Sequence, residues 1–138
     1  MTDRELLEFA AKAAGWTWWQ SKHGYWNIKG PDCEERAACC GWFKFDSYTG
    51  SNLAEPTPAD ALIEVGFNPL DDDGDALRLA IQIGAQGYFG LEVQPTCVQA
   101  TCLEPWEHCE YEEYKTQAPY AATRRAIVRA AAEIGRAM

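Results

Sequence analysis

The feature that most restricts the fold of this chain is its shortage of large apolar side chains. Leu, Ile, Val and Phe together supply 24 of the 138 residues, and the formal net charge is −9. Such a composition is typical of disordered chains. Six Trp and six Tyr, however, supply large rigid surfaces, and 21 Ala allow helices to approach closely. We therefore predict a folded domain whose core consists largely of aromatic rings held between a sheet and its helices.

Length and charge limit the class of protein further. A chain of 138 residues has the size of one domain, so residues 1–138 are predicted to fold as a single unit. No apolar run approaches the roughly 20 residues that a membrane span needs, and residues 1–15 lack the apolar core of a signal peptide. We expect a cytoplasmic protein with free thiols. The negative charge argues against direct binding to nucleic acid.

Three helices are predicted from caps and from apolar spacing. Thr2 and Glu5 form a capping box for a helix that ends near Gly15. An aspartate cluster begins a second helix over residues 68–84, with Leu77, Ala80 and Ile81 expected to face inward. Pro119 begins a third helix that runs to about Arg136. Its predicted buried stripe is Ile127, Ala130, Ala131 and Ile134, with Arg125 and Arg129 on another face.

Short aromatic and β-branched stretches predict the strands, which are residues 16–20, 25–29, 42–45, 87–93 and 106–114. Residues 94–105 contain two prolines and favour a wide turn or irregular hairpin. Residues 46–59 favour a loop that can end in a short helix, capped by Thr57 with Pro58 in its first turn. The predicted fold is α+β: a three-layer α/β/α sandwich with a mostly antiparallel sheet of four or five strands and about three helices.

Two groups of residues resemble metal ligands. Cys97, Cys102, His108 and Cys109, with Cys33, Cys39 and Cys40 upstream, could supply a tetrahedral zinc site, but paired CxxC spacing is missing. Inert buried thiols are the favoured interpretation. Asp71, Asp72, Asp73 and Asp75 resemble a calcium loop, but the Gly and Glu that such a loop requires are missing. Helix capping is favoured there, and we predict no metal and no cofactor.

No catalytic motif is recognised in the sequence. A cysteine nucleophile would need a histidine base, and His23 and His108 lie in no recognisable catalytic context. Nucleophile elbows, HExxH helices and phosphate-binding loops are likewise missing from the sequence. We therefore assign no catalytic residue and expect a protein that is not an enzyme.

Two surfaces could bind a partner. The indole rings of Trp16, Trp18, Trp19 and Trp26 could form a stacking platform, although core positions are favoured and alternation sends Trp18 and Trp19 to opposite faces. Residues 104–114 carry five glutamates among aromatic rings. Such a row can imitate phosphates toward a basic protein, although most acidic runs are simply solvated. Residues 115–138 carry a net charge of +4, which leaves −13 for the rest of the chain.

Three segments resemble those of small tailed-phage and prophage proteins, and more loosely the phage ABA sandwich domain family. They are MTDRELLEFAAKAAG, FNPLDDDGDALRLAIQIG and APYAATRRAIVRAAAEIGRAM, which together cover 54 residues. The resemblance implies an α/β/α layered fold and a phage or prophage origin, hence the cytoplasm of a bacterial host. It brings no catalytic residues, because the matched segments contain only caps and helix stripes.

These observations favour a noncatalytic phage accessory protein that binds a host or phage macromolecule, for example as an inhibitor of a host defence or nucleic-acid-processing complex. We expect a protein partner because of the acidic surface, while its binding residues and the oligomeric state stay open. The alternatives are a small zinc-binding module that uses Cys97 and Cys102, and a small enzyme in which His23 or His108 meets a carboxylate or thiol in a pocket.

Overall fold

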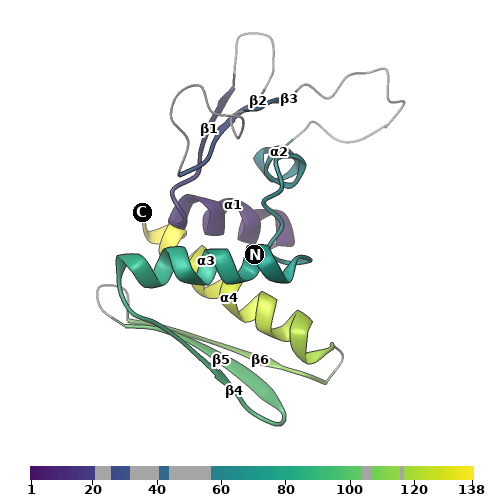
Figure 1. Cartoon of the computed structure of the whole chain (residues 1–138), viewed down its shortest axis with the longest axis vertical. Helices are drawn as coiled ribbons and strands as arrows, with labels where there is room; N and C mark the ends of the chain where they lie inside the picture. Colours follow the sequence, from purple (N-terminus) through teal and green to yellow (C-terminus); the bar gives the residue numbers. More distant parts are fainter. Residues whose placement is uncertain (21–25, 32–40, 44–56, 104–106, 116) are drawn as a thin grey trace.

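The computed structural model describes residues 1–20, 26–31, 41–43, 57–103, 107–115 and 117–138 (Figure 1). The described chain is α+β, with four helices and two small antiparallel sheets. The helices are α1 (Asp3–Ala13), α2 (Pro58–Glu64), α3 (Asp73–Gln86) and α4 (Pro119–Ala137). The strands are β1 (Thr17–Gln20), β2 (Trp26–Lys29), β3 (Gly41–Phe43), β4 (Phe89–Val93), β5 (Cys97–Cys102) and β6 (His108–Glu113). The predicted α+β class and antiparallel pairing are confirmed.

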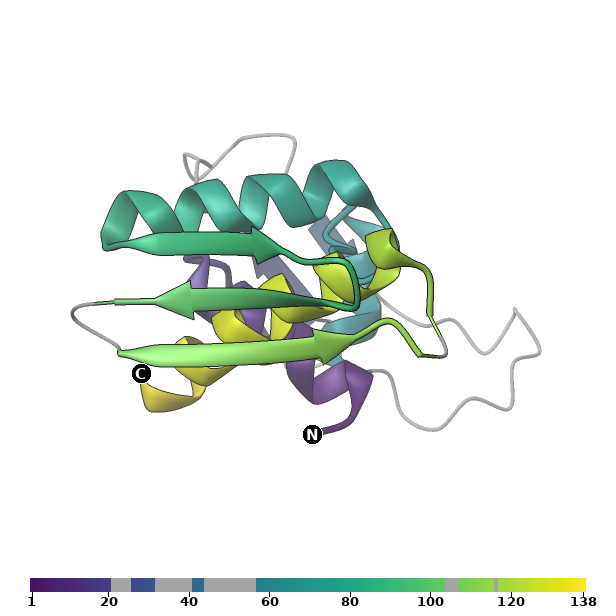
Figure 2. The ribbon, with the colours of Figure 1, turned by 90° about the horizontal axis from the view of Figure 1, so that it is seen from below.

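Helix α4 lies at the centre of the molecule. It contacts α1 on one side and β5 and β6 on the other, and α3 lies beside it (Figures 1 and 2). The predicted stripe of Ile127, Ala130, Ala131 and Ile134 is buried as expected. Helices α1 and α4 cross closely at Gly135, where an added Cβ would lie 1.8 Å from the carbonyl oxygen of Phe9. Small side chains thus allow the helix contact that organises the fold.

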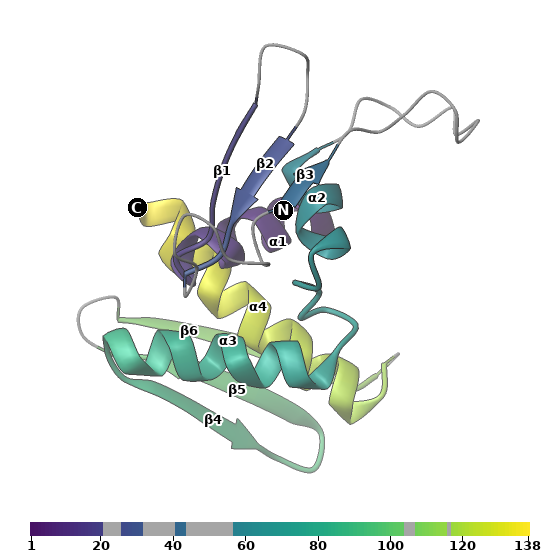
Figure 3. The same cartoon turned by 45° about the horizontal axis from the view of Figure 1, so that its top comes forward.

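The two sheets lie on opposite sides of the helices (Figures 1 and 3). The first has the order β1-β2-β3 and the second the order β4-β5-β6. In the second sheet, Leu91, Ala100 and Glu110 are cross-strand neighbours on the face that meets α4. The helices cover only this face, so the expected single sheet between two helix layers is not the arrangement in the described chain. The second sheet packs one face against α3 and α4, whereas in the first sheet β2 contacts α2.

Strand β5 corrects the prediction for residues 94–105. Residues 97–102 form the middle strand of their sheet and pair with both neighbours along their length. Val98, Ala100 and Cys102 are fully buried on the helix-facing side. Of the two prolines that favoured a turn, Pro95 precedes the strand and removes none of its hydrogen bonds, and Pro105 lies outside the described residues.

The buried core of the described residues is aliphatic, which corrects the predicted aromatic core. Its largest fully buried side chains are Ile, Leu and Val, and Phe67 is the one aromatic ring within it. Trp16 and Trp18 are half-buried at its margin, while Trp19 is 53% exposed. Alanine-rich helices approach too closely to enclose indole rings, so few large aliphatic side chains suffice to fill the remaining space.

Helix α3 turns a different face inward from the one predicted. Ala76, Leu79 and Ile83 are buried, Ala80 is half-buried, and Leu77 and Ile81 are 60% and 62% exposed. Both sets recur at helical spacing, so periodicity alone does not choose between them. The helix also continues past Gly84 to Gln86. The result is a helix with an apolar stripe on its exposed side.

Candidate interaction surface

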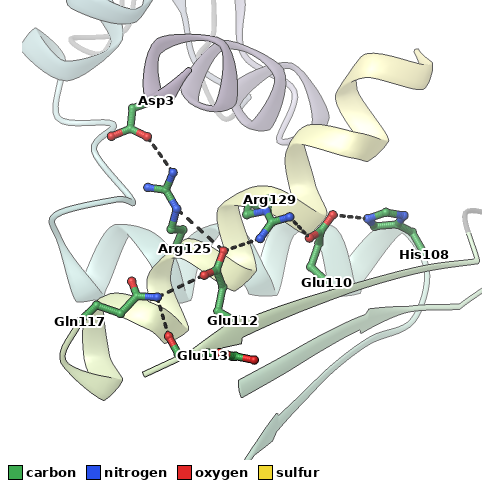
Figure 4. A network of polar contacts seen from close by, with 8 residues as sticks. All are labelled: Asp3, His108, Glu110, Glu112, Glu113, Gln117, Arg125 and Arg129. Carbon is green, nitrogen blue, oxygen red and sulfur yellow. Dashed lines mark hydrogen bonds and ion pairs between the residues drawn. The ribbon is translucent and has the colours of Figure 1, made fainter. Parts of the chain in front are cut away.

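Two of the carboxylates of strand β6 are paired with an arginine inside the fold. Because side chains alternate along a strand, Glu110 and Glu112 point toward α4 and are 9% and 8% exposed. Arg129 lies 2.8 Å from Glu110 and 2.5 Å from Glu112 (Figure 4). The predicted row of solvent-facing carboxylates is therefore wrong at these two positions, while Glu104 lies outside the described residues. The described part of residues 104–114 does not form a continuous phosphate-like surface.

The same network joins three elements (Figure 4). Arg125 of α4 lies 3.1 Å from Asp3 of α1 and 3.8 Å from Glu112. The ring Nε2 of His108 lies 2.8 Å from Glu110. Hydrogen bonding to Glu112 raises the pKa of Arg129 above its ordinary value, against the opposing effect of desolvation. The positive charge of the C-terminal region therefore serves to hold α4 against β6 and α1.

The described thiols of the second sheet differ in their exposure to solvent. Burial, with a smaller contribution from Cys109, raises the pKa of Cys102 to about 11, so its thiol is protonated at neutral pH. Cys97 is also buried, whereas Cys109 is exposed. His108 contacts a carboxylate as the enzyme alternative requires, but it does not line the neighbouring cavity of about 320 Å³, to which Glu110 contributes. His23 lies outside the described residues.

The proposed metal ligands are distributed along the second sheet. Cys97 and Cys102 lie at opposite ends of β5, opposite Glu113 and His108 respectively. Within the described residues, no three His, Cys, Asp or Glu side chains are arranged to hold a metal ion. Cys33, Cys39 and Cys40 lie outside those residues.

The aspartate cluster caps α3, as the sequence predicts. Asp72 accepts a hydrogen bond from the backbone N–H of Asp75 (2.8 Å), and Asp75 accepts one from that of Asn68 (3.0 Å). Asp73 is paired with Arg124 of α4 at 2.6 Å. The carboxylates thus stabilise the helix N-terminus and its attachment to α4.

The tryptophans of the first sheet do not form a flat platform in the described chain. Trp16 packs against Phe67 with ring centroids 5.5 Å apart and planes inclined by 50°. Trp16 and Trp18 line a depression of about 400 Å³ together with Glu8 and Lys12. Trp19 is exposed and Trp18 half-buried, which confirms that they point to opposite faces. Their main contribution is to close the margin of the core.

A groove with a mostly apolar lining lies between α3, β4 and the start of α4. Its volume is about 400 Å³, and its apolar lining includes Leu77, Leu91, Val93, Tyr120 and Ile127. The first four side chains are between 41% and 74% exposed. Arg124 lies at the rim, where it is paired with Asp73. Clusters of this kind mark interaction sites in soluble proteins.

Ile81 extends the apolar surface along α3. It lies one helical turn after Leu77, on the same side of the helix. The exposed fractions of Leu77, Ile81, Leu91, Val93 and Tyr120 leave about 500 Å² of apolar side chain in water. We call these five residues the α3/β4 surface. Sequence reasoning missed it because it assigned Leu77 and Ile81 to the core.

Strand β4 borders this surface with an open edge. Within the described residues β4 pairs only with β5, and α3 runs alongside it (Figure 2). The carbonyl of Tyr88 accepts a hydrogen bond from Leu103 (3.2 Å), and the N–H of Gln94 donates to Cys97 (2.8 Å). Alternation therefore turns the backbone groups of Phe89, Leu91 and Val93 toward the open edge.

Comparisons of the chain with protein-family models, with curated proteins and with solved structures find no match. Among the described residues, no helix combines the length and apolar character that crossing a bilayer requires.

Proposed function

We propose that this chain is a noncatalytic accessory protein that binds another protein through the α3/β4 surface. The observation that carries the proposal is the gathering of about 500 Å² of exposed apolar side chain beside an open strand edge. Such an edge offers backbone hydrogen bonds, and the neighbouring apolar side chains offer affinity, which is how proteins add a strand from a partner. A protein ligand with an extended segment satisfies both requirements.

The charge distribution supports a protein partner over nucleic acid. The described arginines of α4 are paired with carboxylates, and the whole chain carries a net charge of −9. Phosphate binding draws on unpaired Lys and Arg that displace counterions. A phage or prophage origin, with action in the host cytoplasm, is proposed from the resemblance of the three helical segments.

The noncatalytic character is supported by the surroundings of His108 and Cys102. Glu110, which contacts His108, is also held by Arg129, so the pair is tied into the helix–sheet contact. Cys102 is buried and protonated. Neither group combines the access and the activated state that nucleophilic catalysis requires.

The test is affinity capture from phage-infected bacteria with the tagged wild-type chain, Leu77→Lys and Ile63→Lys. Ile63 is a matched control, because it is a 43% exposed aliphatic residue on α2, outside the groove. We expect wild type and Ile63→Lys to capture a protein, an untagged copy of the chain included, and Leu77→Lys to capture at least tenfold less. Circular dichroism confirms that each variant is folded. Equal recovery by all three chains would refute the proposed surface.

A further inference from the structure

The α3/β4 surface is complementary to itself about a two-fold axis. We propose that its occupant is a second copy of this chain, which pairs β4 with β4 in antiparallel fashion and extends the sheet across the dimer. This inference rests on the proposed function, since it names the protein that binds the same surface. The argument depends on the register of β4, on the charges it brings together and on the area it covers.

Strand β4 contains no Pro, no Lys and no bulge, and α3 runs alongside it (Figure 2). Natural edge strands are protected by Pro, by Lys, by bulges or by covering elements. The sequence of β4 is FGLEV, it pairs regularly with β5, and within the described residues nothing else hydrogen-bonds to it. The backbone N–H and C=O groups of Phe89, Leu91 and Val93 face outward, so a second β4 strand can pair with them.

A two-fold register centred on Leu91 gives every side chain of the strand a compatible neighbour in the second copy. Leu91 then faces its own copy, and Phe89 faces Val93 of the second chain. All three lie on the sheet face that meets the helices, because they are the neighbours of Cys102, Ala100 and Val98 in β5. The dimer would continue the apolar layer of each sheet across the axis.

The charges of the edge agree with the same register. Glu92 lies on the opposite face of the sheet and would face Gly90 of the second chain, so the two carboxylates stay apart. A register centred on Glu92 would place the carboxylates directly opposite each other, which is unfavourable. Of these two registers, the charges of the edge favour the one centred on Leu91.

Helix α3 would strengthen the contact. Because α3 runs alongside β4 (Figure 2) and Leu77 lines the groove with Leu91 and Val93, the two-fold axis would bring the α3 helices of the two copies toward each other. With about 500 Å² of apolar side chain from each copy and the strand backbone, the dimer buries about 1,200 Å² in total. This area is at the lower end of the range for specific interfaces, so we expect a dimer that dissociates at micromolar concentrations.

The test is sedimentation equilibrium of the purified chain from about 5 to 500 µM, a range that spans the expected dissociation constant. We expect wild type and Ile63→Lys to dimerise alike. Leu91→Lys and Leu91→Glu should each weaken dimerisation at least tenfold, because like charges meet on the axis. Mixing these two variants in equal amounts should restore dimers, since Leu91 faces its own copy. Val93→Lys, at a side chain 64% exposed, gives a second disruption with less risk to folding.

A monomeric wild type at 500 µM would overturn the inference, as would folded Leu91 variants that dimerise like wild type. Failure of the mixed variants to pair would overturn the Leu91-centred dimer. If the wild type is monomeric but captures a different protein in a Leu77-dependent manner, the second copy is excluded and the proposed function stands. If the wild type dimerises but Leu77→Lys captures as much protein as the wild type does, the groove is not the binding surface and the proposed function is refuted.

Discussion

Gly135 offers a quantitative test of the crossing between α1 and α4. In Gly135→Ala the new Cβ would lie 1.8 Å from the carbonyl oxygen of Phe9 and 2.7 Å from its carbon. Both atoms belong to the backbone, so the helices must separate by at least about 1 Å. Overpacking of this kind costs about 3 kcal/mol, while replacing Gly by Ala within a helix returns about 1 kcal/mol. We expect a net loss of about 2 kcal/mol in the free energy of unfolding.

The assay is urea denaturation followed by far-UV circular dichroism, with Gly84→Ala as the matched control. Gly84 also lies in a helix, but its added Cβ would meet only the Cβ of Phe89 at 3.7 Å, an ordinary contact. The free energy of unfolding of the Gly84→Ala control should rise by about 0.5–1 kcal/mol. The thermal midpoint of Gly135→Ala should lie roughly 8 °C below that of the wild type. If Gly135→Ala proved as stable as Gly84→Ala, the close helix crossing would be refuted.

Three further predictions concern the buried polar groups. Arg129→Gln should lower the free energy of unfolding by about 2 kcal/mol, because it removes the main partner of two buried carboxylates. The control Arg78→Gln, at an exposed arginine, should lower it by less than about 0.5 kcal/mol. Equal losses for the two variants in urea denaturation would contradict the network. Burial raises the pKa of Cys102 to about 11, so the folded state retains its proton more firmly. The contribution of the protonated thiol to the free energy of unfolding is complete below the ordinary thiol pKa and falls by about 2–3 kcal/mol as pH rises through 11. If the difference in free energy of unfolding between wild type and Cys102→Ala stayed constant across this pH range, the prediction would be wrong. The hydroxyl of Tyr114 is buried without a hydrogen-bond partner among the described residues, so Tyr114→Phe should stabilise the protein by about 1 kcal/mol; a lower denaturation midpoint would show that the hydroxyl has a partner.

Local signals in the sequence predicted the helices well. The capping box of Thr2 and Glu5 is present at the start of α1, with the Thr2 N–H donating to Glu5 at 2.7 Å. Thr57 caps α2 with Pro58 in the first turn, and Asp72 caps α3. These contacts involve residues at most three positions apart, so the sequence contains the information that they need.

Features that depend on distant parts of the chain were not predicted. The inward face of α3 is decided by where α4 and β4 lie, and two apolar stripes competed for it. The direction of Glu110 and Glu112 depends on the register of β6 against β5 and on the arginines of α4. Strand β5 was obscured by flanking prolines that lie beyond its ends.

The candidate site was missed for the same reason. Leu77 was assigned to the core from its helical spacing, and Leu91 was placed in a strand without being assigned to either face. The structure fills its core with alanine and a few aliphatic side chains, which leaves these residues available at the surface. The exposed apolar surface thus follows from the close packing of the helices.

Amide hydrogen exchange along β4, measured by NMR over a range of concentrations, tests the central claim most directly. The N–H groups of Gly90 and Glu92 face β5 and should be protected at every concentration. Those of Phe89, Leu91 and Val93 face the open edge and should exchange rapidly in dilute solution. We predict that these three become protected as the chain associates at higher concentration. Rapid exchange at all three up to about 500 µM would contradict an edge that pairs with a second copy.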